Sequence, residues 1–301
     1  MVDLSNKLKL GTQVNEIRKG KNYSQIELAS EELNKNTIVR IEKNVNSPSV
    51  DTLNIIVNNL GIDFCTLTKY NEYANFTDYY RIKDSIEDCF ATLNWSKAKL
   101  QYELISKDMY DSLPLREQQY VDIIQIELVK HIERNYRKAE LLAKKSLNKT
   151  LKAGADFFSH NEMELINIIF QFDQSSQHME LIERVLNWLE GLPDSLQDFP
   201  AYLLLLNGYS TYFYEIEDWN KSYTFASKGY DVAIRSNGLK FIPSFLFTKG
   251  LCLVKLGQDV GEGKKLLKDS LEFCKLIRME DFYGAIIHEL EKYNINLNQD
   301  L

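Results

Sequence analysis

Along the first 70 residues, apolar side chains recur every three or four positions, which is the spacing of a helix with one buried face. One such stripe ends near Gly20, and another begins after Ser49, a residue type that caps helix starts, and ends at Gly61. Their apolar members are Leu10, Val14 and Ile17, and Leu53, Ile56, Val57 and Leu60. A further short helix could start at Asp63. The pattern predicts a small helical domain from Leu4 to Tyr70.

Two more helices are expected between these stripes. Ser24 and Glu27 have the spacing of a capping box, in which a hydroxyl and a carboxylate satisfy exposed backbone donors at a helix start. A helix should therefore begin at Gln25. Residues 30–33 do not continue its apolar face, so the chain should turn before Asn34, which is a favoured N-cap.

The helix after Asn34 has two different faces. Ile38 and Ile41 point inward, because steps of three and four residues return to the same side of a helix. The other face carries Lys35, Asn36, Val39, Arg40 and Lys43. Lysine and arginine can bind guanine acceptors or phosphates, and asparagine can bind adenine through two hydrogen bonds. Such residues are typical of the start of a helix that reads DNA.

This order of helices resembles the repressor-type helix-turn-helix domain of bacterial regulators. In that family, a glutamate of the DNA-reading helix pairs internally with an arginine of the first helix. The resemblance therefore implies a structural ion pair between Arg18 and Glu42, and it implies that Gln25 contacts a phosphate or a base edge. The expected DNA-binding residues are Gln25, Lys35, Asn36, Thr37, Arg40 and Lys43.

Beyond residue 70, small residues follow apolar ones at a fixed offset, at positions 98, 139, 222 and 263. The spacings are 41, 83 and 41 residues, so one member is missing near position 180. This predicts five repeats of about 41 residues, each a pair of helices. The first helices are expected at residues 78–91, 115–130, 160–173, 200–216 and 243–256, and the second helices at 95–107, 135–149, 177–190, 219–235 and 262–277. A last helix, residues 280–292, looks like a terminal cap.

Small residues at the repeat positions let neighbouring helices approach closely, and stacked helix pairs build a superhelix with a concave wall. Gly250, followed by Leu256 and Gly257, resembles a tetratricopeptide repeat. The expected fold is all-α. It comprises a five-helix helix-turn-helix domain (residues 1–69), a linker (70–78), and a right-handed superhelix of about five tetratricopeptide-like pairs with a capping helix (79–301).

Charge and composition limit the function classes. The chain has 301 residues and a net charge of −7. The first 68 residues contain as many basic as acidic residues, so the repeats hold the surplus acid and should bind neither nucleic acid nor an anionic membrane. No apolar run is long enough to span a bilayer, so we expect a cytoplasmic protein. The four cysteines lack a CxxC spacing, which disfavours a metal site. No HExxH, glycine-rich phosphate loop or GxSxG motif suggests an enzyme, and no cofactor is expected.

The two parts together resemble the cytosolic peptide-pheromone receptors of Gram-positive bacteria, known as the RRNPP family. The spacing from Ala29 to Ile38 is nine residues, one fewer than in most repressors, and the turn lacks their glycine, as in the Rgg and PlcR branch. The resemblance implies a homodimeric transcription factor. It would bind a double-stranded DNA operator and be controlled by a short signalling peptide in the concave groove.

The first helices of stacked pairs line the concave side, which gives candidate peptide-binding residues. They are Asn167, Phe170, Asn207, Thr211, Tyr214, Phe247 and Leu251. Asn207 is the strongest candidate, because receptors of this type hold the ligand's main chain with groove asparagines, whose amides donate and accept at once. The aromatic candidates could equally be core between helices, and for Asn207 both interpretations stay open.

Two other functions also stay open. The repeats could bind a partner protein as an interaction scaffold, in which case the N-terminal domain would have lost DNA affinity. Alternatively, the chain could be a repressor-type regulator that senses no peptide. Lys35, Asn36 and Arg40 argue against the first alternative, because a scaffold has no need of them.

Overall fold

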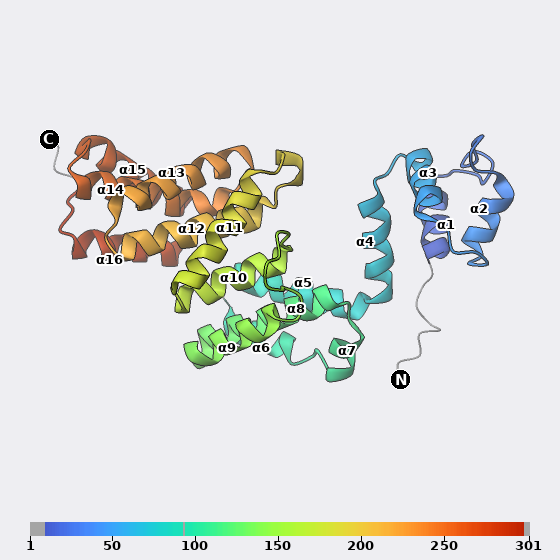
Figure 1. Ribbon diagram of the computed structural model, residues 1–301, viewed down its shortest axis with the longest axis horizontal. Coiled ribbons are helices and arrows are strands. Elements are labelled where there is room, and N and C mark those ends of the chain that lie inside the picture. Colours follow the sequence, from blue (N-terminus) through green and yellow to red (C-terminus); the bar gives the residue numbers. More distant parts are fainter. Residues whose placement is uncertain (1–9, 93, 298–301) are drawn as a thin grey trace. The chain divides into compact units, whose positions relative to one another are not determined.

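The computed structural model describes residues 10–92 and 94–297, and all of the regular elements in these ranges are helices. The chain divides into two compact units, residues 1–118 and residues 119–301. Figure 1 shows the order of the helices along the chain. The all-α fold predicted from the sequence is confirmed.

The N-terminal part of the first unit contains four helices. They are α1 (Leu10–Gly20), α2 (Lys35–Glu42), α3 (Val50–Leu60) and α4 (Phe64–Asn75). The predicted caps are present, because the side chains of Asn34, Ser49 and Asp63 each accept a hydrogen bond from a backbone N–H in the first turn. The four helices enclose one core, whose fully buried members are Val14, Leu28, Ile38, Ile56 and Leu67.

The helix predicted from Gln25 is only a single turn, so this expectation was wrong. The capping box itself forms, with Ser24 N donating to Glu27 Oε2 at 2.7 Å and Glu27 N donating to Ser24 Oγ at 3.2 Å. The turn stops because Ser30 and Leu33 exchange backbone hydrogen bonds and direct the chain towards α2. The domain therefore has four helices and one capped turn among its described residues. Any helical residue before Leu10 lies outside the described range.

The backbones of α1 and α2 meet at Gly11. A Cβ on Gly11 would lie 1.8 Å from the carbonyl oxygen of Ile41, so no other residue fits there without a shift. Asn44 closes this contact, since its Oδ1 accepts from Gly11 N at 3.1 Å and its Nδ2 donates to Thr12 Oγ1 at 2.9 Å. Asn44 has a φ of 55°, a left-handed conformation that asparagine tolerates better than most residues.

The first unit continues through α5 (Thr77–Ala91), α6 (Trp95–Tyr102) and α7 (Lys107–Ser112) to the first residues of α8 (Leu115–Leu128). The helix expected at 95–107 is shorter than predicted, because Ser106 caps a separate helix by accepting from Met109 N at 3.1 Å. Most of the segment expected as a linker, residues 70–78, is helical: α4 extends to Asn75 and α5 starts at Thr77. The division of the chain into compact units falls after residue 118.

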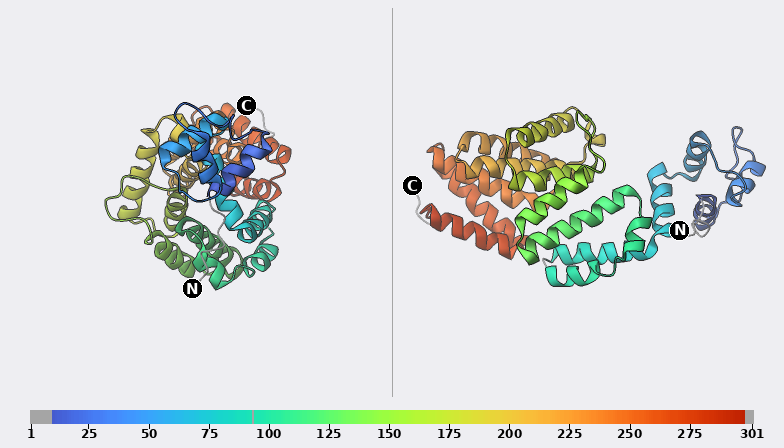
Figure 2. Two further views of the ribbon diagram at one scale, coloured as in Figure 1. Left: turned by 90° about the vertical axis from the view of Figure 1, so that its right-hand side faces the viewer. Right: turned by 60° about the horizontal axis from the view of Figure 1, so that its bottom comes forward.

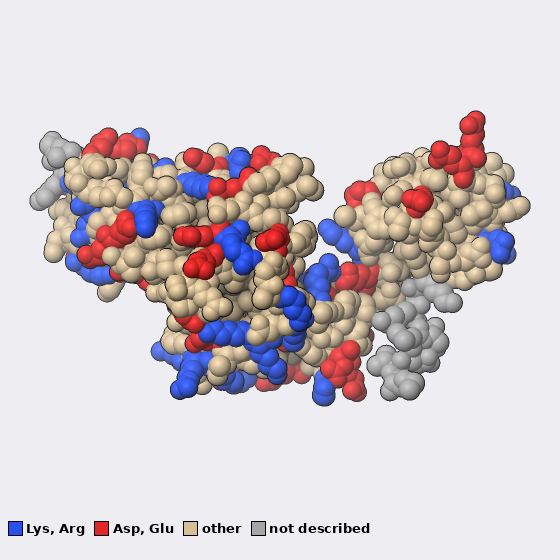
Figure 3. Space-filling model, in the orientation of Figure 1, with Lys and Arg blue, Asp and Glu red and all other residues tan. Residues whose placement is uncertain are grey.

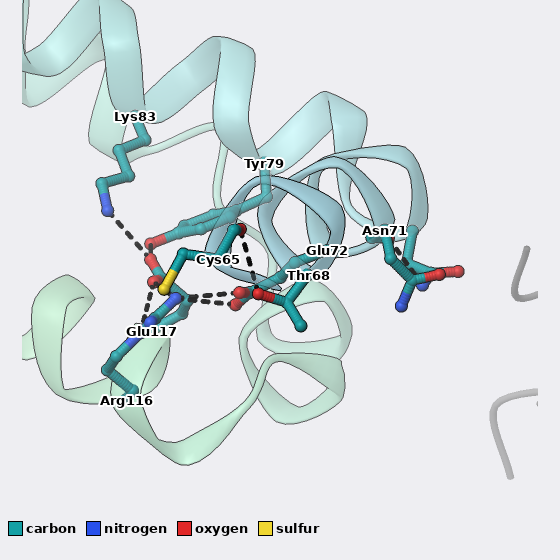
Figure 4. A network of polar contacts seen from close by, with 9 residues as sticks. Cys65, Thr68, Asn71, Glu72, Tyr79, Lys83, Arg116 and Glu117 are labelled. Atoms are coloured by element: carbon teal, nitrogen blue, oxygen red, sulfur yellow. Dashed lines mark hydrogen bonds and ion pairs between the residues drawn. The ribbon is translucent and has the colours of Figure 1, made fainter. Parts of the chain in front are cut away.

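A polar network ties the end of α4 to the first turn of α8 (Figure 4). Arg116 Nη2 donates to both carboxylate oxygens of Glu72 at 2.9 Å. Glu117, with 4% of its side chain exposed, accepts from Tyr79 Oη at 2.7 Å and from Lys83 Nζ at 3.0 Å. Burial acts to raise the pKa of Glu117, but Lys83 and the Tyr79 hydroxyl outweigh it, so that the pKa is lowered.

The second unit is a stack of helix pairs (Figures 1 and 2). After α8, it contains α9 (Tyr136–Leu147), α10 (His160–Phe172), α11 (Ser176–Glu190), α12 (Phe199–Glu215), α13 (Trp219–Arg235), α14 (Ile242–Leu256), α15 (Val260–Leu276) and α16 (Glu280–Lys292). A π-helical turn, Val129–Glu133, follows α8, and short 3₁₀ turns precede α12 and α14. One continuous apolar core runs through the stack from Ile123 to Leu246.

The small residues of the repeat allow the close approach that the sequence predicted. Ala98, Ala139 and Ser222 are fully buried, and the Ser222 hydroxyl donates to the carbonyl oxygen of Ser210 at 2.9 Å. Gly250 of α14 lies against Gly263 of α15, where a Cβ on either residue would be within 3 Å of the other's carbonyl oxygen. In α11, where the small residue is missing, the fully buried Ile182 contributes to the core.

Candidate nucleic-acid interface and cavities of the helical repeats

Helix α2 presents a polar surface to solvent. Lys35, Asn36 and Arg40 are exposed, and so is Lys43 directly after the helix, whereas Thr37 is half-buried. The inward face is Ile38 and Ile41, with at most 1% of each exposed. The candidate DNA-binding residues of α2 thus lie on its solvent-exposed side, and the buried isoleucines on the opposite side pack in the domain core.

The ion pair between Arg18 and Glu42, expected from the sequence, also joins α2 to α1. Arg18 Nε donates to Glu42 Oε1 at 2.6 Å and Arg18 Nη2 donates to Oε2 at 3.0 Å, with 8% and 4% of the two side chains exposed. The hydrogen bond to Glu42 raises the pKa of Arg18, although burial acts against it. Arg18 also donates to Tyr23 O at 2.6 Å and to Asn15 Oδ1 at 2.9 Å. Both ions therefore sit in a network that joins α1, α2 and the capped turn.

Gln25 extends this network towards the surface, which the sequence did not predict. Its Nε2 donates to Glu42 Oε2 at 2.7 Å, so the buried carboxylate fixes the orientation of the Gln25 amide. The half-buried Gln25 keeps its Oε1 without a hydrogen-bond partner among the described residues. A glutamine at the start of a capped turn gives no sequence signal for this pairing.

The distribution of charge differs between the two parts of the chain. On the face drawn in Figure 3, acidic and basic side chains alternate over the helices of the second unit, whereas the helices around α2 carry few of either. Arg40 Nη2 donates to Asn46 Oδ1 at 3.2 Å, which holds the guanidinium near the loop that follows α2. On this face, the candidate interface thus has a few placed polar side chains and no broad basic patch.

A cavity of about 230 Å³ lies between α10 and α12. Four of the seven residues predicted to bind a peptide line it: Asn167 and Phe170 from α10, and Asn207 and Thr211 from α12. The remaining lining residues are Gln171, Gln174, Leu204, Gly208, Tyr212 and Glu215. Phe170 is only 2% exposed and packs against Tyr209 and Tyr212, so it is mainly core, as the alternative interpretation held.

The two asparagines of this cavity are held in different ways. Asn207 Oδ1 accepts from the Ser244 hydroxyl at 2.6 Å. Asn167 is 2% exposed, and its buried Oδ1 has no hydrogen-bond partner among the described residues. That oxygen packs against Gly208, where a Cβ would lie 2.3 Å from it. Both residues line the cavity.

Three of the predicted peptide-binding residues lie elsewhere. Tyr214, Phe247 and Leu251 pack in a separate core beneath α16, with Phe247 9% exposed and Leu251 fully buried. The Tyr214 hydroxyl donates to Glu289 of α16. These three residues do not line the cavity between α10 and α12, because they pack in a core that includes Ile286 and Leu290 of α16.

A larger cavity of about 590 Å³ lies between α9, α10 and α11, under the loop of residues 148–158, and was not foreseen. Its polar centre is Asp173, whose Oδ2 lies 2.8 Å from Lys144 Nζ and 3.2 Å from His178 Nδ1. Hydrogen bonds from Lys144 and from Ser175 N lower the pKa of Asp173 well below its usual range. These charges satisfy one another, so the cavity has no evident ligand chemistry.

Among the described residues, no cluster of His, Cys, Asp and Glu side chains could hold a metal ion. Cys89, Cys252 and Cys274 are buried thiols, and Cys65 is exposed. Burial raises the pKa of Cys252 to about 11, which keeps that thiol protonated at neutral pH. In residues 10–92 and 94–297, no helix is both long and apolar enough to cross a bilayer.

Comparison with known proteins agrees with both parts of the chain. Residues 14–67 match the family model described as helix-turn-helix. No curated protein sequence matches the chain. Among solved structures, PlcR of Bacillus thuringiensis, in complex with the peptide PapR7 and DNA, is 20% identical, with a TM-score of 0.79 over 93% of this chain and 99% of that one.

Two further structures are similar along their whole length. The SHP pheromone receptor Rgg2 of Streptococcus dysgalactiae is 16% identical, with a TM-score of 0.64 over 95% of this chain and 100% of that one. ComR of S. thermophilus, in complex with DNA and its signalling peptide, is 18% identical, with a TM-score of 0.61 over 93% and 98%. The chain thus has the fold of PlcR, Rgg2 and ComR, and the predicted resemblance to this group of structures is confirmed.

Proposed function

We propose that this helix-turn-helix protein is a cytoplasmic, homodimeric transcriptional regulator that binds operator DNA through α2 and is controlled by a short signalling peptide in the groove of its repeats. The observation that carries the proposal is the placement of Lys35, Asn36 and Arg40 on the exposed side of α2, above an ion pair that fixes the helix. The structural likeness to PlcR, Rgg2 and ComR supports the same assignment.

The DNA-binding part of the proposal follows from the chemistry of α2. Lys35 and Asn36 stand at the N-terminus of the helix, where side chains can reach base edges in the major groove. Arg40 and Lys43 lie one and two turns further along and can pair with phosphates. Residues 1–68 carry equal numbers of acidic and basic residues, so a single domain should bind DNA only weakly through nonspecific electrostatic attraction. Weak binding by one domain favours a dimer on two half-sites.

The peptide-binding part rests on the cavity between α10 and α12. Its lining combines apolar side chains with amide groups of Asn167, Gln171, Gln174 and Asn207, which can bond to the main chain of an extended peptide. Main-chain recognition of this kind suits a ligand of defined length and variable side chains. The named complexes of PlcR and ComR contain a peptide and DNA together, which makes the same pair of ligands the first to test.

A gel-shift assay on the DNA upstream of the protein's own gene tests the proposal. Wild-type protein should shift this fragment, and Arg40→Ala should weaken binding by about 5- to 150-fold, since a base contact is worth about 1–3 kcal/mol. Lys265→Ala is the matched control, because Lys265 is an exposed cation on α15. A scaffold protein would give no shift at all, and Arg40→Ala would then change nothing.

A further inference from the structure

One segment of the second unit is strongly basic, although the chain as a whole is acidic. Residues 134–152, which include all of α9, contain seven Lys or Arg and one acidic residue, whereas the net charge of the chain is −7. Two of these cations, Lys144 and Lys149, are neutralised by ion pairs with carboxylates of neighbouring helices or loops. The others lie on or near the exposed side of α9.

A hollow of about 360 Å³ lies on this side of α9, and we call it the α9 hollow. Leu141 is 61% exposed in it, one helical turn from cations on either side. Arg137 and Lys145 are exposed and have no ion pair among the described residues. The lining residues are Asn135, Arg137, Lys138, Leu141, Leu142 and Lys145. The hollow therefore combines an apolar contact with cations that the described chain does not neutralise.

The turn between α12 and α13 has the complementary composition, and we call it the Ile216 turn. Ile216 is 52% exposed and stands directly between Glu215 and Glu217. Both glutamates are exposed, and neither forms an ion pair with a described residue. The next residue, Asp218, caps α13 and lies 3.7 Å from Lys221 Nζ. The turn therefore presents an apolar side chain between two carboxylates without a cationic partner in the part of the chain that the structure describes.

These two surfaces can meet only between two molecules. They lie on different helix pairs of the same compact unit, with the pair α10–α11 between them, so one chain cannot bring them together. The turns within the pairs α8–α9, α10–α11 and α12–α13 lie on one edge of the stack (Figure 1). A two-fold axis at this edge would place the α9 hollow of each copy on the Ile216 turn of the other, so that both contacts form at once.

We propose that the α9 hollow is a docking site for a second copy of this chain, an inference that rests on the homodimer of the proposed function. The two glutamates of the Ile216 turn meet Arg137 and Lys145, and Ile216 covers Leu141. An apolar contact inside a charged rim is the composition of a protein interface. It favours this occupant over nucleic acid, because a phosphate backbone has no apolar group to cover an exposed leucine.

An exchange of charge between the two surfaces tests the proposal on full-length protein. The hollow variant carries Arg137→Glu with Lys145→Glu, and the turn variant carries Glu215→Lys with Glu217→Lys. Either variant alone places like charges in both contacts, so sedimentation equilibrium should show dimerisation at least about a hundredfold weaker than in the wild type. An equimolar mixture of the two variants should dimerise again, because every contact of the mixed dimer joins opposite charges.

The matched control is Lys265→Glu with Lys268→Glu, which changes the net charge as much as the hollow variant does, at two exposed cations of α15. It should dimerise like the wild type. Recovery in the mixture excludes misfolding as the reason that the single variants are monomeric.

Two results would overturn the docking site and leave the homodimer intact. They are a wild-type dimer that both variants preserve, and variants that stay monomeric when they are mixed; in either case the α9 hollow would be left to a different acidic partner. A wild-type protein that is monomeric over the whole concentration range would contradict the homodimer as well. The gel shift with Arg40→Ala tests DNA binding separately, so the failure of this site is distinguishable from the failure of the regulator.

Discussion

The amide oxygen of Asn167 occupies the space that a side chain at Gly208 would need. A Cβ at position 208 would lie 2.3 Å from Asn167 Oδ1, well inside van der Waals contact. Gly208 is therefore the residue that lets α10 and α12 place Asn167 and Asn207 in the same cavity. The position of the Asn167 amide therefore requires that residue 208 have no side chain.

Gly208→Ala should displace Asn167 and strain the packing of α10 on α12. We expect a loss of about 1–3 kcal/mol in the free energy of unfolding, the range for overpacking a buried site. The double variant Gly208→Ala with Asn167→Ala should lose less than the sum of the two single changes, because it removes the colliding amide. Denaturant unfolding of the four proteins measures the coupling. Strict additivity would show that the two residues do not compete for space.

Arg18→Leu should destabilise the helix-turn-helix domain strongly. Glu42 has 4% of its side chain exposed, so loss of its partner leaves a buried charge, at a cost of about 3–5 kcal/mol. The Gln25 amide would lose its fixed orientation as well, since it donates to the same carboxylate. Chemical unfolding followed by circular dichroism measures the effect, and the exposed Arg40→Leu serves as the control. A change as small as that of the control would contradict a buried structural pair.

Glu164→Gln should stabilise the protein at neutral pH and have little effect in acid. Burial raises the pKa of Glu164 in the folded chain, so at a pH above the unfolded pKa folding disfavours the ionised carboxylate and costs free energy. Below about pH 4, the group is protonated in both folded and unfolded states and the penalty disappears. Melting temperatures of the wild type and the variant should therefore differ at pH 7 and converge as the pH falls through the raised pKa. A constant difference at all pH values would exclude titration of Glu164 as the cause.

Glu117→Gln should show the opposite sign. The pKa of Glu117 is lowered by Lys83 and Tyr79, so its ionised form stabilises the fold above its unfolded pKa, near pH 4.5, and the contribution is lost as pH falls through the lowered value. The variant should melt below the wild type at pH 7 and approach it in acid. Should Glu117→Gln melt above the wild type at pH 7, the network of α4, α5 and α8 would not be stabilising.

Most of the helices could be predicted because their stripes, caps and small residues are local signals. The first helices of the last four repeats start within one residue of their expected positions. Asn34, Ser49 and Asp63 were also recognisable as caps from residue type alone. The capped turn at Gln25 was predicted as a helix because the capping box forms in both cases; what ends the turn is the Ser30–Leu33 hydrogen bonding.

The candidate groove could be predicted only in part, because its shape depends on contacts between distant residues. Asn167, Asn207 and Thr211 were found from their places on first helices, and they line the cavity. The Ser244 hydroxyl that orients Asn207 comes from a helix 37 residues further on. Tyr214, Phe247 and Leu251 have the same helical positions as groove residues, but they pack in a core with Ile286 and Leu290 of α16. Hydrophobic periodicity does not predict such contacts between distant helices.

The most direct test of the account is a footprint of the full-length protein on the DNA upstream of its gene, with and without a short apolar peptide that calorimetry has shown to bind the protein. The account predicts two protected half-sites for the wild type, a change in protection on adding peptide, and no such change in Asn207→Ala, which keeps the DNA-reading helix but lacks a groove donor. Protection that is identical with and without a peptide shown to bind would contradict peptide control, and an absence of any protected site would contradict the role of α2.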